Sequence, residues 1–260
     1  MKTITSRDNT LYKDIKRLAI NSQARRKAGR SLLDGVHLCQ TFLQFGGAPL
    51  MCITSESAMV LPEVTAIIAQ CKSSAAQCIM LPNVLYDPLS QVENGIGILF
   101  VIATPAPQTP TKLTQSAVLV DQVQDPGNLG SILRSAAAAG IKEVYCSHGT
   151  AQAWSPRVLR AGMGAHFLMQ IFENADLMGL LRSSDVQVLA TSSHAKNTLY
   201  EVDLREPVAW LFGHEGQGVS ESLLTLVTQT VVIPHLGAME SLNVAASAAV
   251  CLFEQVRQLR

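Results

Sequence analysis

The 260-residue sequence contains no apolar run long enough to cross a membrane, and its opening residues lack the apolar core of a signal peptide. Charged residues make up only 15% of the chain and aromatic residues 5%, whereas 48% of the residues are hydrophobic. This balance is typical of a soluble α/β protein. We therefore expect a cytoplasmic protein with no membrane partner.

The six cysteines do not form a metal-binding pattern. There is no C-x-x-C pair, and no histidine stands at zinc-like spacing from the six positions, which are Cys39, Cys52, Cys71, Cys78, Cys146 and Cys251. In a cytosolic chain this predicts buried free thiols. We expect no metal site.

Several common catalytic signatures are also missing. The chain has no P-loop, no Ser-His-Asp spacing and no paired-carboxylate motif, and the GMGA run at 162–165 follows an expected helix instead of a strand. The absent G-x-G-x-x-G fingerprint argues against ordinary NAD binding.

The formal net charge is zero, but the charges are segregated along the chain. Residues 1–30 hold nine Lys and Arg against two acids (+7), residues 31–110 hold one base against five acids (−4), and the remainder holds ten against thirteen (−3). The basic segment indicates either a solvated helix face or a polyanion partner such as nucleic acid.

Strands alternate with helices in the first third, which predicts a small α/β/α domain over 1–103. We expect helices at 9–18, 36–47 and 61–72, and strands at 31–35, 49–54, 77–82 and 95–103. A Pro-rich connector over 104–112 then marks a domain boundary.

The second domain, 113–260, has the pattern of a doubly wound parallel sheet. Expected strands lie at 117–123, 143–147, 166–172, 186–193, 207–213 and 231–233. Expected helices lie at 131–140, 155–165 and 175–184, after Ser220, and from about 242 onward. General connectivity rules favour a plain Rossmann-like sheet, since knotted chains are almost absent.

The first candidate site loop runs from residue 126 to 134, where a strand leads through a DPGNLG turn into a helix. Backbone N–H groups at the helix start could hold an anion or a ribose oxygen, with Asn128 as cap and hydrogen-bonding group. Arg134 stands among alanines, so it is either paired at a site or extended to the surface.

Two further loops follow expected strands. Three glycines, Gly213, Gly216 and Gly218, surround Glu215 and allow close approach of the backbone to a ligand. We expect His214 to be an ordinary loop residue. The third loop carries Ser241 and Asn243, either of which could cap the last helix. Such loops at strand carboxyl ends suit a cofactor held by backbone amides.

Taken in order, these loops resemble the SpoU/TrmH family of RNA ribose 2′-O-methyltransferases, within the knotted SPOUT class. The family motif N-x-G-x-x-x-R matches 128–134, F-G-x-E-G-x-G matches 212–218, and I-P-x-x-G-x-x-x-S-L-N-V matches 233–244. Residues 1–103 are similar, more loosely, to the RNA substrate-binding domain of the family, although Asp34 stands where a glutamate is more usual. Ala245 and Ala246 also replace a serine-containing pair often seen after the third motif.

The resemblance implies a deep trefoil knot in place of the plain sheet, after a ribosomal-protein-like α/β/α domain. It also implies a homodimer formed through the knot region and S-adenosyl-L-methionine as cofactor. The basic segment 1–30 becomes an expected RNA contact, with ribosomal RNA preferred over transfer RNA.

The site residues are carried over from the same motifs. The expected catalytic residues are Arg134, Asn128, Glu215, Ser241 and Asn243. The expected cofactor-binding residues are Gly213, Ile233, Leu242, Thr191, Leu211 and Gly218.

Three alternatives remain at this stage. They are a tRNA ribose 2′-O-methyltransferase, a non-catalytic RNA-binding protein of the same fold, and a base methyltransferase of the wider knotted class. The nucleotide that is modified is not encoded in any motif of the chain.

Overall fold

The computed structural model describes residues 1–92 and 95–260, which form two compact units. One unit comprises Met1–Pro105 together with Trp154–Phe167, and the other comprises Ala106–Ala153 and Leu168–Arg260. Residues 93 and 94 belong to the range 1–103 expected for the first domain and lie outside the described residues.

The first unit contains a mixed sheet in the order β1-β4-β3-β5-β2. Its strands are β1 (Lys2–Thr3), β2 (Arg30–Asp34), β3 (Met51–Ser55), β4 (Gln77–Leu81) and β5 (Ile98–Ala103). Strands β1, β4 and β3 run parallel, whereas β5 is antiparallel to both of its neighbours.

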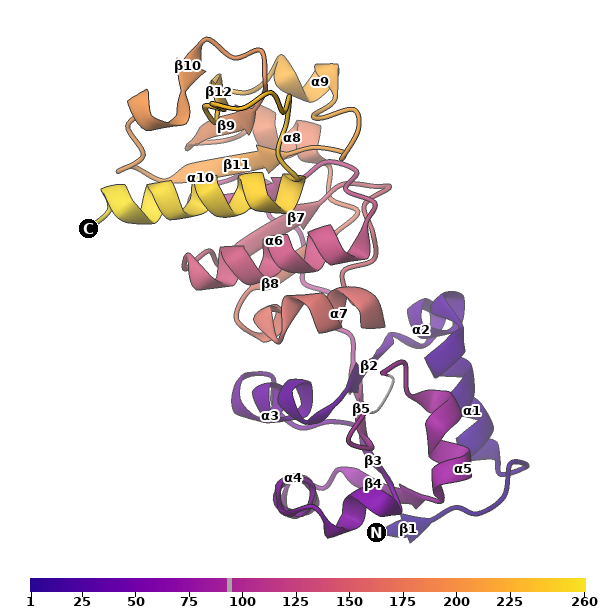
Figure 1. The fold of residues 1–260 in the computed structure, drawn as a ribbon. Coiled ribbons are helices and arrows are strands. Elements are labelled where there is room, and N and C mark those ends of the chain that lie inside the picture. The colour runs from indigo at the N-terminus through magenta and orange to yellow at the C-terminus, as the bar shows by residue number, and fades with distance from the viewer. Residues whose placement is uncertain (93–94) are drawn as a thin grey trace. The chain divides into compact units, whose positions relative to one another are not determined.

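Helices cover both faces of this sheet. They are α1 (Thr10–Ile20), α2 (Ser22–Ala28), α3 (Val36–Phe45), α4 (Pro62–Ser73) and α5 (Asn83–Tyr86). Side chains alternate along each strand, so one face packs against α1 and α5 and the other against α3 and α4 (Figure 1). The expected α/β arrangement of this region is therefore present.

Helix α2 was not expected from the sequence. It buries none of its side chains, so it has no apolar periodicity to reveal it. Local contacts define it instead: the Asn21 side chain caps its start by accepting from the N–H of Ala24, and Gly29 ends it in a left-handed conformation.

Helix α7 (Pro156–Gly162) and the 3-10 turn η3 (Ala165–Phe167) group with the first unit, although the sequence placed them in the second domain. The helix packs against β2, and the Phe167 ring meets Phe42 edge-on at 5.2 Å between centroids. These packing contacts join residues far apart in sequence, which local patterns do not reveal. The other 3-10 turns are η1 (Ser57–Val60), η2 (Asp87–Leu89) and η4 (Leu199–Glu201).

The second unit is built on a parallel sheet in the order β10-β12-β9-β11-β6-β7-β8. Its strands are β6 (Ala117–Val120), β7 (Glu143–Cys146), β8 (Gln170–Glu173), β9 (Gln187–Thr191), β10 (Asn197–Thr198), β11 (Val208–Phe212) and β12 (Gln229–Val232). The prediction of a parallel α/β sheet is confirmed. The strand expected at 166–172 begins only at Gln170, after η3.

The remaining helices are α6 (Pro126–Ala138), α8 (Leu177–Arg182), α9 (Glu221–Leu224) and α10 (Val244–Gln258). Leu119 and Leu211 share a core with residues of α8 and α9. On the other face α10 packs against α6 and β11, side by side with α6 in Figure 1. The Trp210 indole N–H there donates to Oε1 of Gln255 at 2.9 Å.

The order of the strands creates a switch point between β6 and β11. From β6 the chain proceeds to β7 and β8 on one side, whereas β9, β12 and β10 lie on the other side of β11. Parallel sheets bind ligands at the carboxyl ends of the strands that flank such a point. The three motif loops follow β6, β11 and β12 at this edge.

Candidate active site

The glycine loop, residues 213–220, leaves the carboxyl end of β11 and folds back on itself. The backbones of His214 and Gly218 exchange two hydrogen bonds, at 3.0 and 2.8 Å. A Cβ on Gly213 would collide with the backbone of Gly218 and Val219, and Gly218 has a φ of +71°. Both positions therefore require glycine.

His214 organises this loop, as expected for a loop residue. Its Nδ1 atom accepts hydrogen bonds from the N–H groups of Gly216 (3.0 Å) and Gln217 (3.2 Å). This one ring nitrogen thereby ties the backbone of two successive residues to the turn.

The first motif starts a helix earlier than the sequence suggested. Residues 126–130, expected as a turn, form the first turns of α6, and Asp125 is its N-cap, accepting from the N–H of Asn128 at 2.8 Å. Pro126 suits the first helical position because its missing N–H needs no partner there. The prediction that Asn128 caps the helix was wrong, and its side chain is left to make other contacts.

The third motif ends in the cap of α10. The Asn243 Oδ1 atom accepts from the N–H groups of Ala245 (2.9 Å) and Ala246 (3.3 Å), which settles the choice between Ser241 and Asn243 as cap. The helix begins at Val244, two residues later than expected.

A continuous chain of hydrogen bonds joins the three motifs. Asn243 Nδ2 donates to Asn128 Oδ1 at 2.9 Å, and Asn128 Nδ2 donates to Glu215 Oε1 at 3.0 Å. The Glu215 carboxylate also accepts from the N–H groups of Gln124 (3.2 Å) and Asp125 (3.0 Å). Residues separated by up to 115 positions are thereby held in one orientation.

The Glu215 carboxyl group is kept ionised by these contacts. Partial burial alone would raise its pKa. The hydrogen bonds from the Asn128 side chain and from the N–H groups of Asp125, Glu215 and Gln124 outweigh that effect and lower the pKa to about 2. At neutral pH the residue is therefore an acceptor that orients Asn128.

The remaining expected catalytic residues are exposed. Arg134 lies on α6, six residues beyond Asn128, which is about 9 Å along a helix. Ser241 lies in the loop before α10, and its side chain is exposed as well. Both groups are accessible to a ligand of the size of a nucleic acid.

The expected cofactor-binding residues gather at the same edge of the sheet. Gly213 follows β11 and is buried, Thr191 ends β9 and is half-buried, and Ile233 directly follows β12 with 9% of its surface exposed. The Leu211 side chain lies in the core beneath the glycine loop, whereas Leu242 is 41% exposed.

Sequence reasoning missed one buried acid at this edge, Asp121. It is 4% exposed and lies directly after β6, and its carboxylate accepts from the N–H of Ser220 at 3.0 Å. The expected strand extended to 123 and so enclosed Asp121. An acid directly after a buried apolar strand is the signal that would have identified it.

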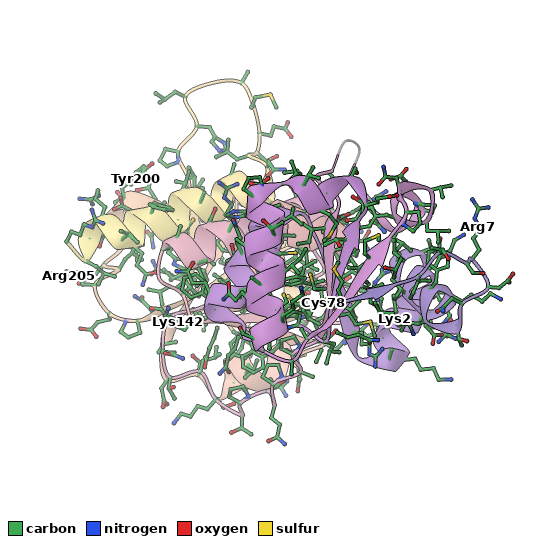
Figure 2. The ribbon with its side chains drawn as sticks, turned by 90° about the horizontal axis from the view of Figure 1, so that it is seen from below. Lys2, Arg7, Cys78, Lys142, Tyr200 and Arg205 are labelled. Atoms are coloured by element: carbon green, nitrogen blue, oxygen red, sulfur yellow. The ribbon has the colours of Figure 1, made fainter. Side chains whose placement is uncertain are left out.

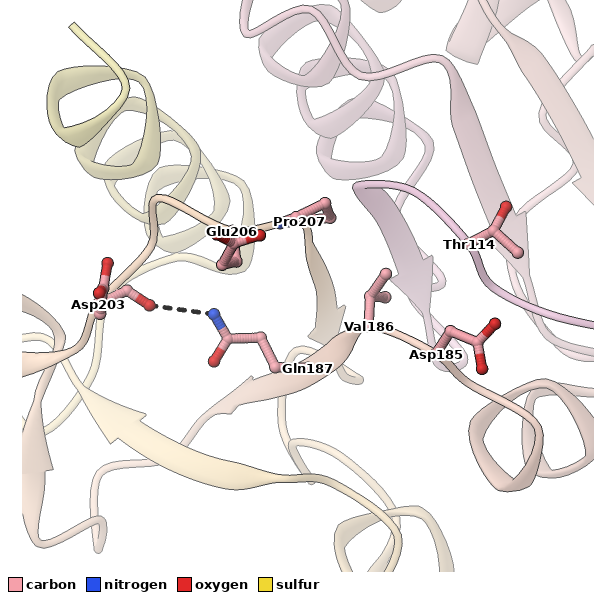
Figure 3. Close-up of a pocket in the computed structure, with 7 residues that line it drawn as sticks. All are labelled: Thr114, Asp185, Val186, Gln187, Asp203, Glu206 and Pro207. Atoms are coloured by element: carbon pink, nitrogen blue, oxygen red, sulfur yellow. Dashed lines mark hydrogen bonds between the residues drawn. The ribbon is translucent and has the colours of Figure 1, made fainter.

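A cavity of about 540 Å³ lies elsewhere in this unit, at the amino ends of the strands (Figure 3). It is lined by Thr114, Asp185, Val186, Gln187, Asp203, Glu206 and Pro207. None of these residues belongs to the three motifs.

Across residues 1–92 and 95–260, no cluster of three or more His, Cys, Asp or Glu residues could hold a metal ion, and no helix is long and apolar enough to cross a membrane.

The structure is an α/β protein whose parallel sheet carries three hydrogen-bonded loops at its carboxyl edge, beside the switch point where such sheets bind ligands. The family described as SpoU rRNA Methylase matches residues 115–253, which contain all three motifs. The chain belongs to this family, and the resemblance found in the sequence is confirmed.

Similar proteins extend the match to the whole chain. An uncharacterised tRNA/rRNA methyltransferase of Synechocystis is 31% identical over 98% of this chain and 94% of its own. The 23S rRNA (guanosine(2553)-2′-O)-methyltransferase of Bacillus subtilis is 29% identical over 97% of this chain and 98% of its own. An AdoMet-bound rRNA methyltransferase from Sinorhizobium meliloti superposes with a TM-score of 0.87 at 25% identity, covering 100% of this chain and 98% of that one.

Proposed function

We propose that this protein transfers a methyl group from S-adenosylmethionine to a ribose 2′-hydroxyl of RNA, in large-subunit ribosomal RNA. The observation that carries this proposal is the hydrogen-bonded chain Glu215–Asn128–Asn243, which links the three motifs of the family at the switch point of the sheet. The names of the Bacillus subtilis and Sinorhizobium meliloti relatives support the reaction and the cofactor.

The glycine loop fits the cofactor. Gly213 leaves no room for a side chain because the backbone of Gly218 and Val219 lies directly against it, and this close approach keeps the loop in its tight fold. Ile233 and Leu242 add apolar surface on one side, and Thr191 adds a hydroxyl group. When bound, S-adenosylmethionine supplies an electrophilic methyl group on its sulfonium.

Arg134 is the proposed electrostatic catalyst. A guanidinium stays protonated at neutral pH, so it binds the neighbouring phosphate and stabilises the negative charge that develops on the ribose 2′-oxygen while the hydroxyl proton passes to solvent. Asn128, Ser241 and Asn243 hold the ribose in line, and alignment of this kind can lower the barrier by several kcal/mol. Glu215 fixes the orientation of Asn128.

The first unit is the proposed RNA-binding domain, and its basic residues differ in their contacts. Arg25 has a structural role, because its guanidinium donates to the carbonyl groups of Leu18 (2.7 Å) and Ala19 (3.3 Å) at the end of α1. By contrast, Arg7, Lys16 and Lys27 are exposed, and Figure 2 shows Arg7 at the periphery of its unit. These exposed side chains are the proposed phosphate contacts.

The path of the C-terminal segment supports the proposed knot. Asn243, at the start of α10, contacts Asn128 of α6, whereas Gln258 at its end donates to the carbonyl group of Val202 at 3.1 Å. The last helix thus runs from the first motif to the segment between β10 and β11. We propose the domain limits 1–103 and 113–260, with α7 and η3 added to the first domain.

The proposed homodimer forms through the knot region. Exposed apolar side chains occur in the third motif and on α10, with Leu236 at 104%, Met239 at 75% and Phe253 at 48% exposure. Burial of these groups against a second copy would remove an apolar surface from water. A cytoplasmic location is part of the same proposal, since bacterial relatives act on ribosomal RNA.

The test combines a biochemical and a genetic assay. Purified protein, radiolabelled S-adenosylmethionine and total RNA from a deletion strain are incubated, and the labelled nucleosides are then identified. We expect a ribose 2′-O-methylated nucleoside in 23S rRNA at the position that the deletion strain lacks. Label in tRNA favours the tRNA reading, and label on a base overturns ribose chemistry. Without label and without cofactor affinity, the protein is a non-catalytic RNA binder.

A further inference from the structure

The buried carboxylate of Asp121 has no role in the three motifs, yet it contacts the loops on both sides. Its Oδ2 atom accepts from the N–H of Ser220 at 3.0 Å, and its Oδ1 atom accepts from the Ser147 hydroxyl at 3.4 Å. Its own N–H donates to the carbonyl of Phe212 at 2.8 Å, which extends the pairing of β6 with β11. Asp121 therefore joins the last residue of the glycine loop to the loop that follows β7.

Two carboxylates hold the glycine loop from opposite directions. Glu215, inside the loop, reaches out to the N–H groups of Gln124 and Asp125 in the segment after β6. Asp121, at the start of that segment, reaches back to Ser220 at the end of the loop. The loop is thus attached to the same segment at its centre and at its end.

Burying a carboxylate in a protein costs free energy. Asp121 is 4% exposed, and removing a charge from water costs free energy that an apolar side chain of similar size would avoid. The N–H that it accepts from is the first backbone donor at the start of α9, where the Ser220 side chain makes no cap hydrogen bond. The benefit that offsets the cost is a fixed position for this backbone group.

The neighbouring residue carries backbone strain supported by the same contacts. Gln122 has a φ of +56°, which is uncommon for a residue other than glycine. Its N–H donates to the Ser147 hydroxyl at 3.0 Å, and that hydroxyl donates in turn to Asp121. Strained conformations of this kind persist where surrounding contacts over-determine them, and they are concentrated at functional sites.

We propose that Asp121 is a positioning residue for the methyl-transfer reaction, and that it holds the glycine loop in the conformation that binds S-adenosylmethionine by accepting from the N–H of Ser220. The inference rests on the proposed function of the site. Asp121 acts through the backbone of the loop and does not itself touch the reacting atoms. Its loss lowers the fraction of molecules with a competent loop, and apparent affinity falls by the same factor.

The test compares Asp121→Ala, Asp121→Asn and Ser147→Ala in the full chain, well below their unfolding temperatures. Cofactor affinity is measured by calorimetry, and the KM for cofactor and for RNA by methyl transfer. Amide hydrogen exchange reports on residues 213–220. We expect Asp121→Ala to weaken cofactor binding roughly tenfold to a hundredfold, because a charge-assisted hydrogen bond is lost. The KM for RNA should stay within about twofold, and exchange should accelerate in the glycine loop but not in α10.

Asp121→Asn keeps an oxygen acceptor without the charge, so the loss should be intermediate, about threefold to tenfold. This variant also decides the question if Asp121→Ala does not fold. Ser147→Ala removes the longer contact to Asp121 and the acceptor of the Gln122 N–H, but it leaves the contact of Asp121 with Ser220 in place, so cofactor affinity should stay within about twofold.

A folded Asp121→Ala or Asp121→Asn protein with wild-type affinity and wild-type exchange in the loop overturns the proposal. So does a Ser147→Ala protein that is as impaired as Asp121→Ala. If the wild type itself fails to bind S-adenosylmethionine, the proposed function is wrong. The exchange measurement then still shows whether Asp121 holds the loop.

Discussion

The two edges of the parallel sheet in the second unit differ in what they offer a ligand. The amino edge has a cavity of about 540 Å³, lined by Asp185, Asp203 and Glu206 among others. The carboxyl edge has the three linked loops, with Glu215, Asn128 and Asn243 joined by hydrogen bonds.

This difference favours the carboxyl edge as the proposed site, on the ground of its long-range contacts and not of cavity volume. At the amino edge the acids form exposed ion pairs, Asp203 with Arg205 two residues away and Asp185 with Lys112. At the carboxyl edge the contacts join segments about 90 to 115 residues apart, so each one fixes the geometry of the fold. Exposed pairs of the first kind contribute little to stability.

The largest expected effect comes from removing one arginine at each edge of the sheet and comparing the rates of methyl transfer. Arg134→Ala should lower the rate of methyl transfer by roughly a thousandfold, since it removes the proposed electrostatic catalyst, while cofactor affinity stays unchanged. Single-turnover assays and calorimetry measure the two quantities. Arg205→Ala, near the amino-edge cavity, is the matched control and should retain the wild-type rate. Turnover at the wild-type rate in Arg134→Ala would remove this residue from the mechanism.

The next effect tests the close approach in the glycine loop. Gly213→Ala introduces a Cβ against the backbone of Gly218 and Val219, so the loop must open and cofactor affinity should fall at least about tenfold. Gly237→Ala, in the third motif, is the steric comparison: a Cβ there meets no atom within 4 Å, so cofactor affinity should fall less than in Gly213→Ala. Equal affinity of both variants, measured by calorimetry, would contradict the fit of the loop to a cofactor.

A smaller effect concerns pH. Hydrogen bonds lower the pKa of Glu215 to about 2 from an ordinary 4.5, so the ionised carboxylate stabilises the folded state above pH 4.5, and that contribution is lost as the pH falls towards 2. We expect the Tm advantage of the wild type over Glu215→Gln to shrink across this range. A constant difference from pH 5 to pH 2 would argue against the ionised contact.

Asp203→Asn provides the comparison for this pH experiment. Its carboxyl pKa is also lowered to about 2, by the hydrogen bonds from Arg205, so its contribution to Tm should fade in a similar acid range. At neutral pH only Glu215→Gln should reduce methyl transfer.

The smallest expected effect is at the amino-edge cavity itself. The double variant Asp203→Asn, Glu206→Gln changes two of its lining acids and should leave kcat and both KM values within about twofold of the wild type. A large loss in steady-state methyl transfer would mean that the cavity takes part in the reaction. The proposed site would then not be confined to the carboxyl edge.

Much of the fold followed from short-range patterns. Apolar runs that form the buried strands β6 and β11, alternating with helical patterns, indicate the parallel sheet. The residues at which helices begin and end were harder to predict from the sequence. The run 125–130 contains Pro, Gly and Asn, which favour turns, yet Asp125 and Pro126 together start α6 there. α2 escaped detection because a helix that buries nothing has no apolar stripe.

For the candidate site, too, the sequence revealed the residues of the motifs but not the contacts between them. Asn128, Glu215 and Asn243 were recognisable as motif residues, but their mutual hydrogen bonds were not, since nothing in the sequence specifies which side chains meet. Asp121 was hidden inside an expected strand. Its contact with Ser220 spans 99 residues and exists only because β6 and β11 are neighbours in the sheet.

By itself the sequence determined the family, the three motif loops and their position after strands, because these depend on residue types at short spacing. Only the tertiary structure decided that Asn243 caps α10 and that α7 groups with the first unit. It also decided that two carboxylates hold the glycine loop from opposite directions. The Asn243 cap is a local contact that the sequence left open between two residues. The contacts of the two carboxylates depend on which strands lie side by side, and strand order is set by packing over the whole unit and not by any local pattern.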